Sequence, residues 1–153
     1  MVSEQFRAGS PITFLYLVKH AAEYPDFSVG DAFGLLSNIR GEQVLAGYTA
    51  PFPDDNYIAG VRKFLSCVPL LEHHQADCDA NDRAWAVLEA FDRPLLTAFS
   101  DGGPVTKGGE AEFQQRVPGA ESVKHTTNTG GRHFLQEDQP EQLSHSIITF
   151  MRD

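Results

Sequence analysis

The sequence has little cysteine, and this shortage argues against a CxxC motif and against a zinc site. Its 153 residues include two cysteines, Cys67 and Cys78, which lie too far apart for a CxxC motif. A metal site formed with the neighbouring His73 and His74 would need ligands that converge from separate elements, which the sequence does not show. We therefore expect two reduced thiols in a cytoplasmic protein, and neither a metal nor a cofactor.

Basic charge and long apolar runs are also scarce. Twelve lysines and arginines oppose 21 aspartates and glutamates, so the net charge is -9, and such a chain is repelled by nucleic acids and anionic membranes. No run of about 18 apolar residues could cross a bilayer, and MVSEQFRAGS lacks the features of a signal peptide. The hydrophobic fraction of 41% and the charged fraction of 22% are typical of a globular protein.

The first half of the chain carries helical signals. Ser10-Pro11 is a favourable helix start, and Pro25 ends the apolar run that follows. Apolar residues recur at helical spacing between Tyr57 and Cys67, and Asp54 or Asp55 can cap that helix. The predicted helices cover residues 12–22, 29–37, 42–48 and 57–67. Residues 1–78 thus form a predicted helical region.

The second half alternates helices and strands. The polar stretch HHQADCDAND is predicted to be a loop, with a cap at Asp79 or Asn81 for a helix that reaches Phe91. Strands are predicted at 95–99 and 121–125, and helices at 109–116 and 140–151. Residues 79–153 therefore have the pattern of an α/β fold with a parallel sheet. Two strands alone are marginal, so either strands were missed or another chain supplies them.

Three segments resemble haloalkane dehalogenases of the α/β-hydrolase superfamily. They are TAPFPDDNYIAGVRKF at 49–64, FDRPLLTAFSDGGPVT at 91–106 and GGRHFLQED at 130–138. Their order implies a partial α/β-hydrolase fold: a helical cap followed by a βαβα C-terminal portion. The family's nucleophile elbow belongs to the front half of the fold, and neither G-x-D-x-G nor G-x-S-x-G occurs in this chain.

The resemblance also implies catalytic roles. His133 matches the general base that activates water against an alkyl-enzyme ester. The family's acid falls at Gly103, so Asp101 is a candidate substitute, although turn chemistry alone explains an aspartate in DGGP. Arg132 replaces the usual glycine before the histidine. We expect its guanidinium to oppose protonation of His133 and to crowd the loop.

Apolar positions of the family's substrate pocket match several residues here. The family's halide-binding tryptophan falls at Leu17, which has no N–H to donate, and the sole tryptophan, Trp85, is expected in the core. Helical packing alone also explains spacings such as Phe64 and Val68. The substrate-binding residues implied by the resemblance are Phe14, Phe64, Val68 and Val105.

Three functions remain open at this level. The chain is a haloalkane dehalogenase-like fragment that is inactive alone, or one half of a split hydrolase completed by a separate N-terminal half. The third is a non-enzymatic homo-oligomer that binds a protein or a small apolar, halogenated ligand. An incomplete fold exposes apolar surface, which favours association.

Overall fold

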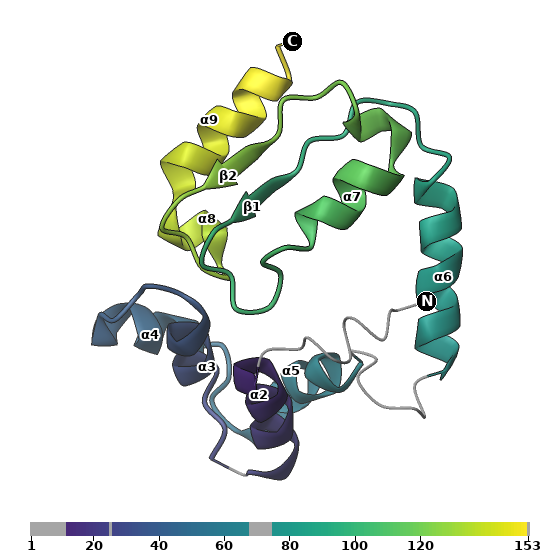
Figure 1. Ribbon diagram of the computed structural model, residues 1–153. Coiled ribbons are helices and arrows are strands. Elements are labelled where there is room, and N and C mark those ends of the chain that lie inside the picture. Colours follow the sequence, from purple (N-terminus) through teal and green to yellow (C-terminus); the bar gives the residue numbers. More distant parts are fainter. Residues whose placement is uncertain (1–11, 25, 68–74, 153) are drawn as a thin grey trace. The chain divides into compact units, whose positions relative to one another are not determined.

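The structure is a computed structural model that describes residues 12–24, 26–67 and 75–152 (Figure 1). The chain forms two compact units. One comprises Met1–Leu35 with Ile39–Ala84, and the other comprises Leu36–Asn38 with Trp85–Asp153. The three residues 36–38 thus belong to the second unit, although the residues on both sides of them belong to the first.

The first unit is helical. Its elements are α2 (Ile12–Glu23), α3 (Val29–Leu36), α4 (Glu42–Thr49), α5 (Asp55–Ser66) and most of α6 (Gln75–Leu88). Helix α2 packs on α5, and buried apolar side chains come from both, among them Leu17, Ala21 and Ile58. None of the helices in the described ranges is long and apolar enough to cross a membrane.

Polar side chains cap the start of helix α5 and join this helix to α2. The Asp54 carboxylate accepts a hydrogen bond from Asn56 N at 2.9 Å, which confirms the predicted N-cap. Arg62 donates to the carbonyls of Ala21, at 2.8 Å, and Tyr24, at 2.9 Å. Carbonyls at a helix C-terminus have no partner within the helix, so this arginine satisfies them and joins α5 to the end of α2.

Helix α6 begins earlier than predicted. The stretch expected as a loop is helical from Gln75, and Gln75 Nε2 donates to Asp79 Oδ1 at 2.7 Å, one turn along. Asp77 in the first turn also interacts favourably with the helix dipole. A helix supported by such polar pairs lacks the apolar period on which the sequence prediction depended. The candidate ligands His73 and His74 lie outside the described residues.

Neither cysteine forms a disulfide in the described part of the chain. Cys67 is exposed and Cys78 is buried. In the ranges that the structure describes, no group of three histidine, cysteine, aspartate or glutamate side chains is arranged to hold a metal ion.

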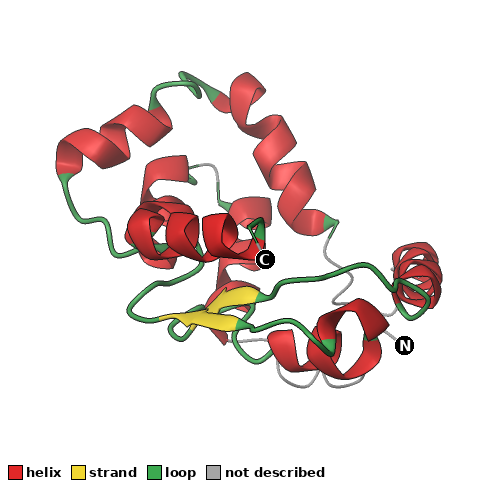
Figure 2. Ribbon diagram, turned by 90° about the horizontal axis from the view of Figure 1, so that it is seen from above, coloured by secondary structure: helices red, strands yellow, loops and turns green. Residues whose placement is uncertain are grey.

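The second unit contains a small parallel sheet. Strand β1 (Ala98–Ser100) pairs with β2 (Thr126–Asn128), with Ala98 opposite Thr126 and Ser100 opposite Asn128 (Figure 2). Helix α7 (Glu110–Arg116) and the 3-10 turn η1 (Pro118–Ala120) connect the strands, and α8 (Leu135–Asp138) and α9 (Pro140–Phe150) follow β2. Helix α9 lies beside β2 (Figure 1). A mostly helical chain with a small parallel sheet confirms the predicted fold class.

Both strands lie later in the sequence than predicted. Leu95 N donates to Gly119 O at 2.9 Å instead of joining a strand ladder. Residues 121–125 continue the turn after η1, because Glu121 N bonds to Pro118 O and Val123 N to Ala120 O. The predicted strand at 121–125 is therefore wrong, and pairing begins at Thr126. Polar TTN carries no apolar signal, although threonine suits a strand.

A histidine side chain bridges the segment before β1 and the turn. His125 Nδ1 accepts from Thr97 N at 3.1 Å, and its Nε2 lies 2.9 Å from Ala120 O. Because the carbonyl can only accept, Nε2 carries the proton and the ring is the neutral tautomer. The imidazole thus satisfies two backbone groups that the strand ladder does not reach.

The sole tryptophan, which was expected in the core, is half-buried and packs against side chains of this unit. The Arg116 guanidinium lies 4.0 Å from the Trp85 ring centroid, and Phe113 contacts the same ring. Arg116 also pairs with Glu89 at 2.7 Å and with Glu112 at 3.2 Å. The hydrogen bond to Glu89 is the main cause that raises the pKa of Arg116. Trp85 fluorescence will therefore report on the folding of this unit.

Candidate functional site

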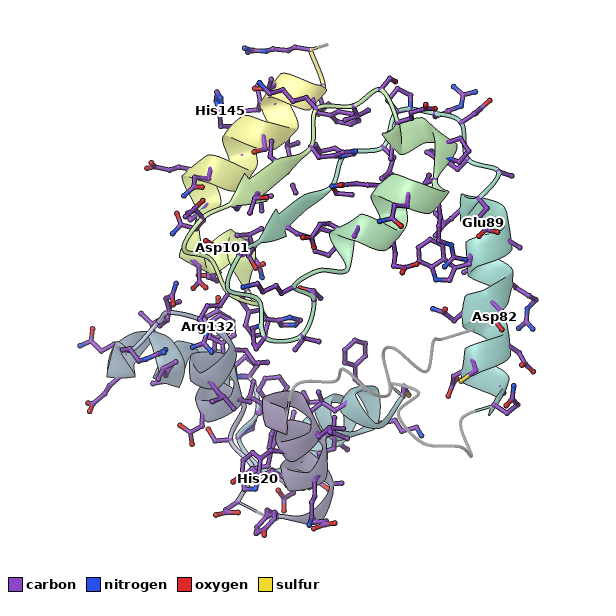
Figure 3. The ribbon with its side chains drawn as sticks, viewed as in Figure 1. His20, Asp82, Glu89, Asp101, Arg132 and His145 are labelled. Carbon is purple, nitrogen blue, oxygen red and sulfur yellow. The ribbon has the colours of Figure 1, made fainter. Side chains whose placement is uncertain are left out.

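The loops that follow the two parallel strands lie against each other and carry both predicted catalytic residues. Asp101 comes directly after β1, and the loop after β2 leads to His133. Gly102 N donates to Gly131 O at 3.1 Å, and Asp101 N to Asn128 O at 3.4 Å. Figure 3 shows Asp101 and, on the second loop, Arg132. The carboxyl ends of parallel strands are where α/β folds place their ligands and reacting groups.

His133 is half-buried between these loops and residues 36–38. Its backbone N donates to Leu36 O at 3.0 Å, and its ring meets Phe134 edge-on. Among the described residues its buried Nδ1 has no hydrogen-bond partner. Burial lowers the pKa of His133 below the usual 6.5. The imidazole is therefore neutral at pH 7, which is the state a general base requires.

The effect of Arg132 differs from the one expected. The lowered pKa of His133 comes from burial, while Nη1 of Arg132 is 3.4 Å from Ser37 O. The arginine backbone fits the loop: its N donates to Asp138 and its O accepts from Ser100 Oγ. No non-glycine residue in the described ranges has a positive φ, so an arginine at this position leaves the loop backbone unstrained.

Asp101 holds the turn of the histidine loop. Its Oδ1 accepts from Gly130 N at 2.8 Å, where the glycine has φ of +80°. This contact supports the reading of Asp101 as a turn residue, because the carboxylate satisfies a backbone N–H of a tight turn. Its role as a catalytic acid stays a prediction.

Gly103 occupies the position where the family pattern places the acid. It is buried, and a Cβ added there would lie 2.8 Å from Ser100 Oγ and 3.2 Å from Thr106 Oγ1. Both neighbours are side-chain hydroxyls, which can rotate. Because position 103 has no carboxylate, Nδ1 of His133 is expected to lack a hydrogen-bond partner.

The structure describes the side chains of two of the four predicted substrate-binding residues. Val105 is half-buried in the turns after Gly103, and Phe64 on α5 is 76% exposed. Phe14 belongs to α2, but its side chain, like the whole of Val68, lies outside the described residues. The pocket role of these four residues stays a prediction. Leu17, at the predicted halide position, is buried in the first unit.

Two residues that shape the site carried no signal in the sequence analysis. Ser100 Oγ donates to Arg132 O at 2.9 Å. Asp138 accepts the backbone N–H of Arg132 with one oxygen and that of Asn38 with the other. Asp138 and Asn38 are 100 positions apart in the sequence, so only the folded chain reveals their contact.

We expect His133 to titrate below pH 6.5 in the folded protein. Protonation then favours the unfolded chain, so stability falls as the pH drops below 6.5. NMR titration of the imidazole measures this midpoint, with His133→Gln to assign its signal. The same variant should lose less stability than wild type between pH 7 and pH 5, measured by urea unfolding. A midpoint at or above 6.5 would contradict the burial seen for this ring.

Three known proteins similar to this chain are described as haloalkane dehalogenases. The chain is 38% identical over 133 residues to a haloalkane dehalogenase of Psychrobacter cryohalolentis, covering 86% of this chain and 43% of the relative. It is 33% identical to a haloalkane dehalogenase of Mycolicibacterium paratuberculosis, with 82% and 39% covered. A third, from Mycobacterium marinum, is 36% identical, with 70% and 35% covered. No family model matches the chain.

The chain spans about two fifths of the length of the curated relatives it matches. The similarity extends over most of this chain. The chain is therefore homologous to haloalkane dehalogenases over part of their length and is a partial α/β-hydrolase.

Proposed function

We propose that this chain supplies the cap and the histidine-bearing part of a hydrolase that cleaves carbon–halogen bonds in small apolar compounds. The observation that carries the proposal is the pair of adjoining loops with a neutral, half-buried His133. The nucleophile is an aspartate that these 153 residues do not present on an elbow. A second segment, in a partner chain or the same one, must provide it.

His133 acts in the second half of such a reaction. The aspartate displaces halide from carbon and forms an alkyl-enzyme ester. Neutral His133 then takes a proton from water as the water attacks the ester carbonyl, which releases the alcohol and restores the carboxylate. Residues 1–153 alone lack the group that forms the ester, so we propose that they give no turnover.

Reconstitution tests this proposal. We expect no halide release from a small bromoalkane with the purified chain, and release when the chain is co-expressed with the part of the Psychrobacter cryohalolentis relative that the match does not cover. His133→Ala in the assembled protein should lower turnover by roughly 10²- to 10⁴-fold, the usual contribution of a general base. His145→Ala, an exposed histidine on α9, is the matched control.

Two outcomes would contradict the proposal. One is halide release from the purified chain that disappears with His133→Ala, since the nucleophile would then lie within these residues. The other is a folded assembly, verified by circular dichroism, in which His133→Ala and wild type turn over equally. A cytoplasmic location for the assembled enzyme stays a prediction.

A second candidate is a homo-oligomer that binds an apolar ligand or a protein. Exposed apolar side chains on α9 favour it: Met151 follows the helix at 78% exposure, and Ile147 and Ile148 are also exposed. Self-association would cover them. Light scattering separates the candidates, because a clean monomer at high concentration counts against association.

A further inference from the structure

One carboxylate joins two chain segments that are far apart in sequence. Asp138, at the end of α8, is half-buried. Its Oδ1 accepts from Asn38 N at 2.8 Å, and its Oδ2 accepts from Arg132 N at 2.8 Å. Both oxygens thus receive a short, charge-assisted hydrogen bond from a backbone N–H. Asp138 therefore fastens residues 36–38 to the histidine loop.

Three further bonds connect the same two segments. His133 N donates to Leu36 O at 3.0 Å, Asn38 Nδ2 donates to Gly130 O at 2.7 Å, and Arg132 Nη1 lies 3.4 Å from Ser37 O. Ser37 is fully buried. These contacts explain why residues 36–38 belong to the second unit, and they show that the carboxylate is part of a continuous set of bonds.

We infer that Asp138 is a positioning residue for His133. The backbone N–H groups of Arg132 and His133 are both fixed, the first by Asp138 and the second by the carbonyl of Leu36. Fixing them sets the path of the chain at His133 and hence the direction in which its side chain leaves the loop. This role matters when no acid orients the ring, as the absence of a partner for Nδ1 indicates.

An ionised carboxylate suits this position better than any isosteric group. Each oxygen accepts one N–H, so both donors are satisfied. An asparagine offers one oxygen, and its NH₂ group would face the other N–H without a bond. Glu137 lies beside Asp138 in the same short helix with an exposed side chain. Glu137→Gln therefore changes charge and size by the same amount as Asp138→Asn, but it leaves the bonds from Asp138 to Asn38 and Arg132 in place.

The test compares Asp138→Asn with Glu137→Gln in the full chain. We expect Asp138→Asn to move the NMR titration midpoint of His133 up by about half a pH unit, because a loosened loop admits water to the ring. Glu137→Gln should leave it unchanged. A purely structural role would lower the urea midpoint, followed by Trp85 fluorescence, without moving the titration. An unchanged His133 titration in folded Asp138→Asn would overturn the inference.

A measurement on the wild-type chain covers the case in which Asp138→Asn fails to fold. The amide hydrogens of Asn38 and Arg132 should both exchange slowly, since both are bonded to a half-buried carboxylate. Exchange of either amide as fast as that of the exposed Gly108 amide would refute the bridge. Slow exchange of both amides supports it.

The catalytic consequence of this role rests on the proposed function. In the reconstituted hydrolase, Asp138→Asn should lower kcat by roughly 10- to 100-fold, because a small displacement of a catalytic group has an effect of that size. Ester formation, followed as a burst of halide release, should persist. If Asp138→Asn shifts the His133 titration but no assembly turns over, the proposed function fails and the positioning role stands.

Discussion

Replacing Gly119 by alanine is expected to lower the free energy of unfolding by about 3 kcal/mol, at the upper end of the usual cost of overpacking. A Cβ at this position would collide with the backbone carbonyl of Arg93. The glycine is buried in η1, so the added methyl group cannot turn toward solvent. One of the two backbone segments must therefore move.

Movement is costly because hydrogen bonds hold these segments together on both sides of the collision. Gly119 N donates to Phe91 O at 2.9 Å, and Leu95 N donates to Gly119 O at 2.9 Å. Separating the segments weakens both bonds, and a buried backbone group left without a partner costs about 1–3 kcal/mol. The turn therefore requires a residue without a side chain.

Urea unfolding, followed by Trp85 fluorescence and by circular dichroism, measures the effect of Gly119→Ala. The matched control is Gly60→Ala in α5, where an added Cβ has no atom within 4 Å. Because alanine favours a helix interior over glycine, the control should gain about 1 kcal/mol. Gly119→Ala as stable as wild type would mean that residues 91–95 do not follow the path described here.

The second large effect concerns Gly103→Asp, which restores a carboxylate where the family pattern has one. In the reconstituted hydrolase we expect this substitution to raise turnover by as much as about 10⁴-fold. That is the factor lost when the aspartate of a serine protease triad is replaced by asparagine. His133 Nδ1 is buried without a partner in the described part of the chain, so it is free to donate to a new carboxylate.

The surroundings of Gly103 allow the change at a modest cost. A Cβ there approaches Ser100 Oγ at 2.8 Å and Thr106 Oγ1 at 3.2 Å. Rotation of Ser100 relieves the closer contact but gives up its bond to Arg132 O. Losing one such hydrogen bond costs about 1 kcal/mol. The variant should therefore be slightly less stable and still fold.

Gly103→Asn is the control for this experiment, because it has the same size without the charge. It should show the stability loss of the aspartate variant and little of the gain in halide release. Asp101→Asn, tested alongside, reports on the candidate acid: lost turnover would assign it that role. Equal rates for the Asp and Asn variants at position 103 would contradict the expected function of the carboxylate.

The sequence by itself determined the features that depend on local chemistry. Asp54 caps α5, and the last helix begins at Pro140 as predicted, because caps and prolines act on their immediate neighbours. The parallel α/β character followed from the alternation of elements in the second half. The resemblance of GGRHFLQED and its companion segments identified the relationship to haloalkane dehalogenases, which similarity over 86% of the chain confirms.

Only the tertiary structure decided where the strands pair and what surrounds His133. Thr126 begins β2 because its backbone faces β1, whereas residues 121–125 just before it continue the turn after η1. Asp138 bonds to Asn38, 100 positions away in the sequence, and the pKa of His133 is lowered because folding buries the ring. Hydrogen bonds and burial between distant segments leave no periodic or local pattern in a single sequence, so folding alone brings these groups together.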